Sequence, residues 1–262
     1  MLQFGNKVIK AAILDMDGVL WRQNTPIIDL PQLFANFEKH EIKVMLATNN
    51  GAATIDGYIK KLSGFGVKFN KTQVVTSAMA LAFLLKKHYP TGGPLYILGE
   101  NALIETLGEL GFYHSEDKPL AVAAGMDRAL TYEKIKNASL MIQTGIPLYF
   151  TNPDPTYPTP EGILPGAGTL LAALETASGV KAQLAGKPLP FLFEVCLERL
   201  GCTAEETLVV GDRLDTDILG GQASGCKTAL VLTGISSREE GEAWNPKPDL
   251  ILDKISDLFD HN

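Results

Sequence analysis

The chain has 262 residues, of which 45% are hydrophobic and 20% are charged, so it can bury one large core or two medium-sized ones. Its net charge at pH 7 is −7, and its lysines and arginines form no block. Because nucleic-acid backbones require basic patches, this balance excludes nucleic acid as an expected partner. No segment reaches transmembrane length and no signal-peptide core is present, so we expect a cytoplasmic protein that contacts no membrane.

The first predicted strand covers residues 8–14 and is followed by two carboxylates one residue apart, Asp15 and Asp17. In an open α/β sheet the carboxyl end of a buried strand faces the crevice where ligands bind. Two acids that share a crevice repel each other unless a cation joins them, so the pair predicts a divalent-metal site. One aspartate would attack the substrate, and the other would donate and accept a proton.

The same residues have two simpler interpretations, a polar turn and the start of a calcium-binding loop. A calcium loop needs further oxygen ligands in the next few positions, whereas residues 19–21 are apolar, which removes that interpretation. An ordinary turn stays open unless matching groups follow later in the chain.

The second predicted strand, residues 42–47, runs into Thr48, Asn49 and Asn50, ahead of a helix predicted over residues 54–62. Hydroxyl, amide and backbone N–H donors before a helix can bind a phosphate without a full positive charge. Loops are also rich in these residue types because they form turns. Taken alone, the run therefore fits either interpretation.

Residues 81–180 form a block with an α/β pattern of its own, after a helix predicted over residues 76–89. Its predicted strands are residues 95–98, 120–124 and 147–151, and its predicted helices are residues 101–110, 131–142 and 169–177. The block is either an inserted domain or a continuation of the main sheet, and periodicity alone does not separate the two. Its segment of residues 152–162 is expected to be an ordered loop because its prolines fix many dihedral angles.

Two later predicted strands also lead to charged residues. Lys187 follows a strand predicted over residues 183–185, where its ammonium can neutralise carboxylate and phosphate charge. The strand of residues 207–210 leads to Asp212, the best additional metal ligand. Asp217, in the first turn of the next helix, can hold the water of the metal or Lys187.

The remaining predicted elements are helices over residues 190–200 and 217–224 and a strand over residues 227–232. Strands therefore alternate with helices at both ends of the chain. This order is typical of a parallel sheet covered on both faces, so the fold class is α/β, with a Rossmann-like doubly wound sheet.

Four strand ends thus carry, in order, two aspartates, a Thr-Asn-Asn run, a Lys-Pro pair and a Gly-Asp-x-x-x-Thr-Asp run. This combination resembles the haloacid dehalogenase-type phosphatases over essentially the whole chain, and most of all their NagD-like branch, which includes p-nitrophenyl phosphate, phosphoglycolate and pyridoxal phosphate phosphatases. The segments that resemble this branch are residues 48–50, 151–155, 165–168, 186–188 and 211–217. One departure is Gln23, where relatives often have glycine in the flap beyond Gly18.

The resemblance implies that residues 81–180 are an inserted α/β cap domain of type C2, and that residues 1–80 and 181–262 form the catalytic core. It also implies the following roles: Asp15 as nucleophile; Asp17 as general acid and base; Lys187 as charge clamp; Thr48, Asn49 and Asn50 on the phosphate; and Mg²⁺ held by Asp15, Asp212 and the backbone carbonyl of Asp17, with Asp217 behind them. Asp154 and Tyr157, in the cap segment, are expected on the leaving-group side of the substrate.

The activity implied is magnesium-dependent hydrolysis of small phosphate monoesters through an aspartyl-phosphate. The partner is then a small phosphorylated metabolite, such as a sugar phosphate, phosphoglycolate, a nucleoside monophosphate, pyridoxal phosphate or p-nitrophenyl phosphate. A homodimer through the cap is also expected, as in relatives. Two alternatives stay open: a phosphotransferase or mutase with the same intermediate, and a non-catalytic protein that binds phosphometabolites.

Overall fold

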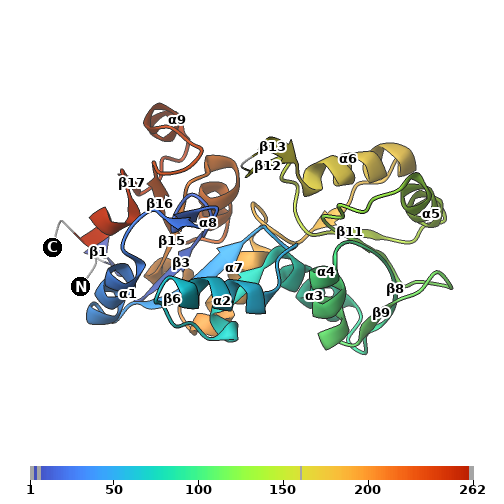
Figure 1. Ribbon diagram of the computed structural model, residues 1–262, viewed down its shortest axis with the longest axis horizontal. Helices are drawn as coiled ribbons and strands as arrows, with labels where there is room; N and C mark the ends of the chain where they lie inside the picture. Colours follow the sequence, from blue (N-terminus) through green and yellow to red (C-terminus); the bar gives the residue numbers. More distant parts are fainter. Residues whose placement is uncertain (1–2, 5–6, 160, 260–262) are drawn as a thin grey trace. The chain divides into compact units, whose positions relative to one another are not determined.

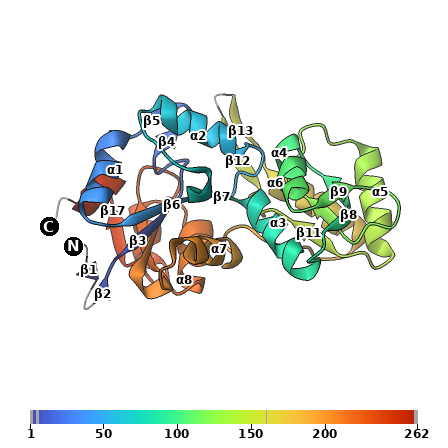
Figure 2. The same cartoon turned by 90° about the horizontal axis from the view of Figure 1, so that it is seen from below.

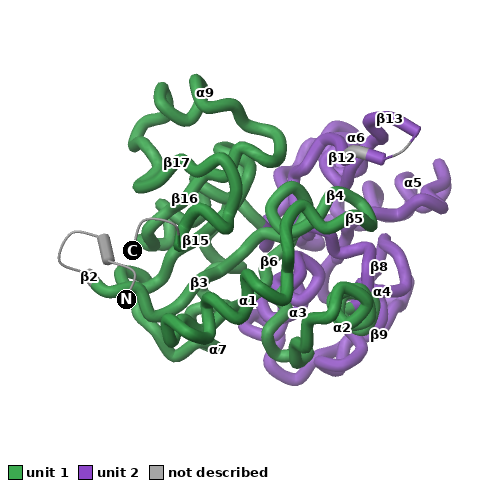
Figure 3. Tube along the Cα trace, turned by 60° about the vertical axis from the view of Figure 1, so that its left-hand side comes forward, with its two compact units in different colours: residues 1–48, 55–75, 187–262 green, residues 49–54, 76–186 purple. Residues whose placement is uncertain are grey.

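The computed structural model describes residues 3–4, 7–159 and 161–259, and the chain divides into two compact units (Figure 3). Unit 1 is Met1–Thr48, Ile55–Val75 and Lys187–Asn262, and unit 2 is Asn49–Thr54 and Thr76–Gly186. Each unit has its own parallel sheet and its own helices (Figure 1). The α/β class with a Rossmann-like sheet is confirmed. The expected cap of residues 81–180 lies inside the range of unit 2, and its role as a cap stays a prediction.

The sheet of unit 1 has six strands in the order β17-β16-β15-β3-β6-β7, and its pairs from β17 to β6 are parallel. The strands are β3 (Ala11–Leu14), β6 (Lys43–Thr48), β7 (Val74–Thr76), β15 (Thr207–Gly211), β16 (Lys227–Val231) and β17 (Leu250–Leu252). All residues of β3 are buried, as expected of a central parallel strand with both faces covered.

Helices lie on both faces of this sheet, with α1 on one side of β3 and β6 and with α7 and α8 on the other (Figure 2). The helices and helical turns of unit 1 are α1 (Leu30–Lys39), α2 (Ile55–Gly64), α7 (Phe191–Leu200), α8 (Leu219–Ala223), α9 (Arg238–Ala243), η1 (Lys71–Gln73), η2 (Ala204–Glu206), the π-helical turn η3 (Leu214–Ile218) and η4 (Ile255–Phe259). Two short hairpins complete the unit: β1 (Gln3–Phe4) with β2 (Lys7–Val8), and β4 (Trp21–Arg22) with β5 (Thr25–Pro26).

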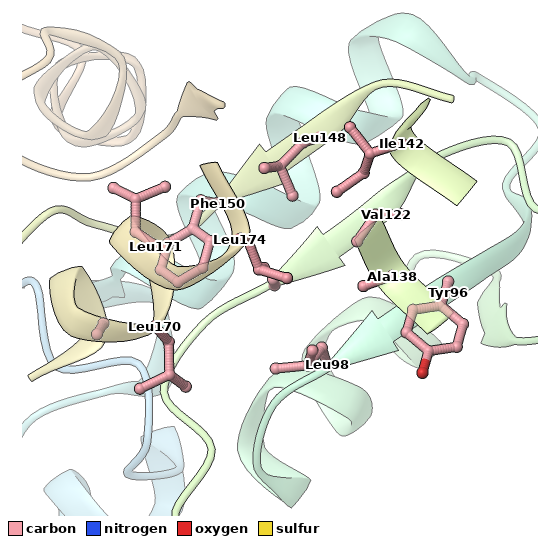
Figure 4. Close-up of a cluster of buried hydrophobic side chains, with 12 residues drawn as sticks. Tyr96, Leu98, Val122, Ala138, Ile142, Leu148, Phe150, Leu170, Leu171 and Leu174 are labelled. Atoms are coloured by element: carbon pink, nitrogen blue, oxygen red, sulfur yellow. The ribbon is translucent and has the colours of Figure 1, made fainter. Parts of the chain in front are cut away.

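Unit 2 has a five-stranded parallel sheet in the order β14-β11-β10-β8-β9. Its strands are β8 (Gly93–Leu98), β9 (Phe112–His114), β10 (Val122–Ala124), β11 (Leu148–Phe150) and β14 (Gln183–Leu184), and its helices are α3 (Ser77–His88), α4 (Asn101–Glu109), α5 (Tyr132–Gln143) and α6 (Ala167–Ser178). Side chains of β8, β10 and β11 pack with those of α5 and α6 in one buried cluster (Figure 4). Unit 2 therefore has a hydrophobic core of its own.

The prediction that residues 183–185 belong to the main sheet is wrong. Residues 183–184 form β14, the edge strand of unit 2, where Gln183 pairs with Tyr149 of β11. Two further hydrogen bonds extend this pairing beyond β14. The backbone N–H of Ala185 donates to the carbonyl of Phe150 at 3.1 Å, and that of Gly186 donates to the carbonyl of Thr151 at 2.7 Å. A strand this short carries no signal for its partner, because pairing is decided by tertiary contacts.

The proline-rich segment contains a strand instead of being loop throughout. β12 (Thr156–Thr159) pairs antiparallel with β13 (Gly162–Pro165), and Pro160 between them lies outside the described residues. Proline is compatible with such an edge strand, which needs few of its N–H groups for pairing.

Among the helices of the described ranges, none is both long and apolar enough to cross a membrane.

Candidate functional site

The carboxyl end of the unit 1 sheet gathers the charged residues predicted from the sequence. Asp15 follows β3, Asp212 follows β15, and Thr48 is the last residue of β6. The backbone N–H of Asp15 donates to the carbonyl of Val210 at 2.9 Å, which continues the pairing of β3 with β15 past the strand end. Because these three strands are neighbours and run parallel, their terminal side chains meet at one edge of the sheet.

Lys187 joins two of the carboxylates. Its Nζ donates to Oδ1 of Asp15 at 2.6 Å, to Oδ1 of Asp217 at 2.7 Å and to the carbonyl oxygen of Ala47 at 2.8 Å. Burial of the ammonium acts to lower the pKa of Lys187, but the charges of Asp15 and Asp217 outweigh it, so this pKa lies above its ordinary value. Lys187 is therefore a buried, permanent positive charge beside Asp15.

Asp217 approaches the site because the backbone leaves it room. It lies in the π-helical turn η3, and its Oδ2 accepts a hydrogen bond from the backbone N–H of Arg213 at 3.2 Å. A Cβ at Gly211 would lie 2.1 Å from Cβ of Asp217, so only glycine permits this approach.

Asp212 is buried, and its Oδ2 accepts a hydrogen bond from the backbone N–H of Ile235 at 2.9 Å. Burial, followed by the charge of Asp217, raises the pKa of Asp212 to about 7. A Cβ at Gly234 would lie 1.8 Å from Oδ2 of Asp212, and one at Gly18 would lie 2.6 Å from it. The carboxylate is thus fixed between two glycines.

The donor set fits a divalent cation. Asp15, Asp212 and Asp217 each offer a carboxylate oxygen, and these atoms all lie within 4.8 Å of one another. Burial raises the pKa of Asp15 well above its usual range; Lys187 opposes this effect, and the charges of Asp217 and Asp212 add to it. Three acids against one lysine leave an excess of negative charge that a hard cation such as Mg²⁺, which prefers oxygen ligands, would offset.

Asp217 thus lies within this three-carboxylate group and also contacts Lys187, one of the two roles that the sequence predicted for it. The carboxylate of Asp17 is not part of the group found among the described residues. The sequence prediction gave Asp17 a metal contact through its backbone carbonyl alone, and that contact stays a prediction.

The carboxylate of Asp17 faces residues that the sequence did not single out. Its Oδ1 accepts a hydrogen bond from Nε1 of Trp21 at 2.9 Å. Neighbouring protein atoms desolvate the carboxyl group and raise the pKa of Asp17, whereas the charge of Lys61 and the hydrogen bond from Trp21 act to lower it. No motif marks Trp21, because the contact depends on the β4–β5 hairpin returning the indole toward the loop.

Thr48 is buried at the end of β6 and shares a side-chain hydrogen bond with Tyr58 of α2. Burial and then the charge of Asp17 raise the pKa of Tyr58, so its hydroxyl stays protonated. The phenol therefore fixes the Thr48 hydroxyl, the group predicted to bind phosphate.

Asn49 and Asn50 belong to unit 2. The backbone carbonyl of Asn49 accepts hydrogen bonds from Oγ of Ser77 at 2.6 Å and from Nδ2 of Asn152 at 2.8 Å. Oδ1 of Asn50 accepts one from the backbone N–H of Ala52 at 3.1 Å, which is an Asx turn. The buried Asn152 thus secures the loop that follows Thr48, and the sequence prediction did not include it as a site residue.

Asp154 and Tyr157, the predicted leaving-group residues, also belong to unit 2. The backbone N–H of Asp154 donates to Oδ1 of Asn152 at 3.2 Å. The hydroxyl of Tyr157 accepts a hydrogen bond from Nε of Arg128 at 3.4 Å, and Nη1 of Arg128 forms an ion pair with Glu100 at 2.7 Å. The contact of both residues with a substrate stays a prediction.

Two family profiles match this sequence. The profile described as haloacid dehalogenase-like hydrolase matches residues 12–113, and one described as HAD-hydrolase-like matches residues 184–258. A dihydroxyacetone phosphatase of Corynebacterium glutamicum is 32% identical over 248 residues, which cover 95% of this chain and 90% of that protein. An acid sugar phosphatase of Staphylococcus aureus is 33% identical over 243 residues, or 92% of this chain and 93% of that protein.

Solved structures are similar over nearly the whole chain. NagD from Escherichia coli has a TM-score of 0.89 at 31% identity and covers 95% of this chain and 98% of its own. A p-nitrophenyl phosphatase from Archaeoglobus fulgidus has a TM-score of 0.90 at 28% identity, with 97% and 100% covered. A glycerol phosphate phosphatase from Mycobacterium tuberculosis, in complex with magnesium, has a TM-score of 0.89 at 32% identity, with 95% and 76% covered.

Proposed function

Since the chain belongs to the haloacid dehalogenase-like hydrolases and is a phosphatase of their NagD-like branch, we propose that it hydrolyses small phosphate monoesters with magnesium, through an aspartyl-phosphate. The observation that carries this proposal is the geometry around Asp15, which Lys187 holds within a group of three carboxylates. Relatives are named dihydroxyacetone phosphatase, acid sugar phosphatase and glycerol phosphate phosphatase, and these names support a phosphorylated sugar or polyol as the substrate class.

In the first step the Asp15 carboxylate attacks phosphorus in line, the bond from phosphorus to the ester oxygen breaks, and Asp17 gives its proton to the departing oxygen. In the second step Asp17 takes a proton from water, and the resulting hydroxide displaces Asp15 from phosphorus and releases inorganic phosphate. Lys187 stabilises the negative charge that gathers when Asp15 and the phosphate approach each other. A magnesium ion held by Asp15, Asp212 and the backbone carbonyl of Asp17, with Asp217 close to them, would add further positive charge at the same place.

Thr48, Asn49, Asn50 and Lys187 are the proposed phosphate ligands. Thr48 and Lys187 are buried in unit 1, and Lys187 contacts Asp15, which supports their assignment. Asp154 and Tyr157 are the proposed leaving-group residues of a cap formed by unit 2. A cap-mediated homodimer and a cytoplasmic location stay predictions.

The test is hydrolysis of p-nitrophenyl phosphate by the wild-type protein and by Asp15→Asn, each with magnesium and with a chelator. We expect magnesium-dependent release of nitrophenol that the substitution reduces by about a thousandfold or more, because it removes the nucleophile. Melting temperature and circular dichroism of the variant should stay close to those of the wild type.

Two outcomes would contradict the proposal. Wild-type turnover by Asp15→Asn in a preparation free of other phosphatases would remove Asp15 as nucleophile. No release under any condition would instead favour a phosphotransferase with a narrow acceptor, or a binding protein. Binding of phosphorylated metabolites without turnover, followed by calorimetry, would identify the latter.

A further inference from the structure

The side chain of Trp21 is completely buried, but it does more than fill the hydrophobic core. The only polar atom of the side chain, Nε1, faces the loop that follows β3. Nε1 of the indole donates to Oδ1 of Asp17 at 2.9 Å. The two residues are also joined through the backbone: the N–H of Gly18 donates to the carbonyl of Trp21 at 2.8 Å, and residues 17 and 21 form an isolated bridge. The turn therefore fixes the indole in relation to the carboxylate.

Lys61 of α2 contacts both the indole ring of Trp21 and the hairpin that carries it. Its Nζ lies 4.3 Å from the centre of the Trp21 ring and donates to the backbone carbonyl of Gln23. A cation over an indole face is attracted to it, so Lys61 fastens both the ring and the hairpin that carries it. Phe65, one turn further along, lies against the ring at a centroid distance of 5.8 Å.

Gln23, whose carbonyl accepts the hydrogen bond from Lys61, has an unusual backbone conformation. Its φ is 55°, in the left-handed region that favours glycine and that a residue with a side chain adopts at some cost. This is the position at which the sequence departs from the glycine of many relatives. The chain thus maintains the tight turn without glycine, and the contact with Lys61 stabilises it.

We propose that Trp21 is a positioning residue for Asp17: its indole N–H holds Oδ1 of the carboxylate, so that Oδ2 is the oxygen that delivers the proton to the leaving group, and Lys61 keeps the indole in place. An indole N–H can donate and cannot accept, so Oδ1 must remain an acceptor whether or not Asp17 carries a proton. The proton is thereby confined to Oδ2. The inference rests on the proposed function, because it assigns an atom to the acid step of that reaction.

The test compares kcat/KM across a series of phenyl phosphates whose phenols range from p-nitrophenol to more basic ones. This ratio reports the step in which the phenol leaves, and a basic phenol needs a proton more than p-nitrophenol does. For Trp21→Phe, which retains a ring and removes the N–H, we expect kcat/KM for the most basic phenol to fall about tenfold further than for p-nitrophenol. Lys61→Met should steepen the dependence in the same direction by a smaller factor.

The chain offers matched controls for both variants. Trp244 also donates from Nε1 to a side-chain oxygen, that of Gln222 at 3.3 Å, so Trp244→Phe removes an indole N–H that has no contact with Asp17. Lys60, the exposed neighbour of Lys61 on α2, provides Lys60→Met. Both should retain the wild-type dependence on the phenol.

A uniform loss across the series would show that Trp21 only supports the fold, and an unchanged series would show that the hydrogen bond has no part in the acid step; either result overturns the inference. If the wild-type protein hydrolyses no member of the series with magnesium, the proposed function itself has failed. Melting temperatures establish that the variants are folded. If Trp21→Phe does not fold, replacement of Trp21 by benzothienylalanine, which keeps the two-ring shape and has no N–H, decides between the same outcomes.

Discussion

At the scale of single residues, the site is defined by an excess of negative charge that the fold does not relieve. One lysine serves Asp15 and Asp217, and Asp212 lies beside them without a cationic partner of its own among the described residues. Buried acids that repel one another are costly for a metal-free fold, because each is deprived of water and close to like charge. A bound cation would remove this repulsion, so the repulsion increases the affinity of the site for a cation.

This charge should make the stability of the metal-free protein depend on pH. The pKa of Asp212 is about 7 in the folded state, whereas an unfolded aspartate has a pKa of about 3.9. Between these values the folded state retains a proton that the unfolded state has lost, so the contribution of Asp212 is full below the lower value and is lost as pH rises to about 7.

Thermal melts of chelator-treated protein, recorded from about pH 4 to about pH 8, test this prediction against Asp212→Asn. The melting temperature of the variant should fall less with rising pH than that of the wild type. Magnesium should stabilise the wild type most near the upper end of this range, where Asp212 is deprotonated. Parallel curves for the two proteins would show that Asp212 does not titrate in this range.

Gly234 is a second residue on which the metal site depends. The Cβ introduced by Gly234→Ala would lie 1.8 Å from Oδ2 of Asp212, so the carboxylate has to move. We expect the affinity for magnesium to fall by about tenfold or more, as when a neighbour that orients a metal ligand is changed. Magnesium titration of the activity measures it.

Gly64→Ala is the control for this variant. Gly64 ends α2, and apart from its chain neighbours and the backbone of the helix, no atom of the described residues lies within 4 Å of its added Cβ. This variant should retain the affinity of the wild type and be no less stable. Equal affinity in both glycine variants would mean that Asp212 tolerates the displacement.

At the scale of secondary-structure elements, the sequence predicted the strands with continuous hydrophobic runs and failed where the signal is tertiary. β6, β15 and β16 follow the predicted ranges to within one residue, because a strand buried on both faces is apolar throughout. β3 covers residues 11–14 of the predicted range 8–14, and Val8 belongs to the separate strand β2. The helix α1 is absent from the predicted elements although its start carries local signals, the cap residue Asp29 and Pro31 in the first turn. The two residues of β14 were placed in the wrong sheet.

In the candidate site too, the sequence predicted the residues that follow strands of the main sheet and missed contacts that depend on tertiary structure. Asp15 and Asp212 follow neighbouring strands of the unit 1 sheet, so the rule that parallel strands end together was enough to bring these two residues into one site. Lys187 follows β14, which belongs to the sheet of unit 2, so this rule does not explain its position. The positions of Trp21 and Asp217 depend on a hairpin and on the missing side chain of Gly211, which no spacing rule contains.

The strand β11 supplies a prediction about stability. Phe150 is completely buried in the core cluster of unit 2, so Phe150→Ala should lower the free energy of unfolding by about 3–5 kcal/mol. Leu140, on α5, is 55% exposed, and Leu140→Ala should change this energy by less than about 0.5 kcal/mol. Urea unfolding followed by circular dichroism measures both.

Tryptophan fluorescence adds a second readout, because both tryptophans of the chain, Trp21 and Trp244, belong to unit 1. If the two units unfold separately, Phe150→Ala should shift the circular dichroism curve and leave the fluorescence midpoint near its wild-type value. An equal loss in Phe150→Ala and Leu140→Ala would contradict the assigned core.

At the scale of the whole molecule, the chain passes repeatedly between two units that each have a sheet and a core. Neighbours in sequence are divided between them: Thr48 belongs to unit 1 and Asn49 to unit 2, and likewise Lys187 to unit 1 and Gly186 to unit 2. The charged cluster lies in unit 1, and the predicted leaving-group residues lie in unit 2. The residues expected to catalyse the reaction and those expected to select the substrate therefore belong to different units.

This division predicts that variants of unit 2 change the choice of substrate without changing the dependence on magnesium. Tyr157→Phe and Asp154→Asn should alter the relative kcat/KM values across a panel of sugar, polyol and aryl phosphates by about threefold to tenfold, the range expected when individual pocket contacts are lost. Tyr113→Phe, at an exposed tyrosine of β9, should retain the wild-type pattern. Unchanged ratios in all three variants would remove both residues from the substrate site.

The central position of β3 has a consequence for the growing polypeptide on the ribosome. Its partner β6 is synthesised soon after it, but its other partner, β15, and with it Asp212, is synthesised only after all of unit 2. Until then one edge of β3 has unpaired backbone groups, and such an edge can pair with another chain. The nascent protein therefore contains its nucleophile, Asp15, long before it can assemble the metal site. Pairing along this edge of β3 has to wait for the synthesis of β15.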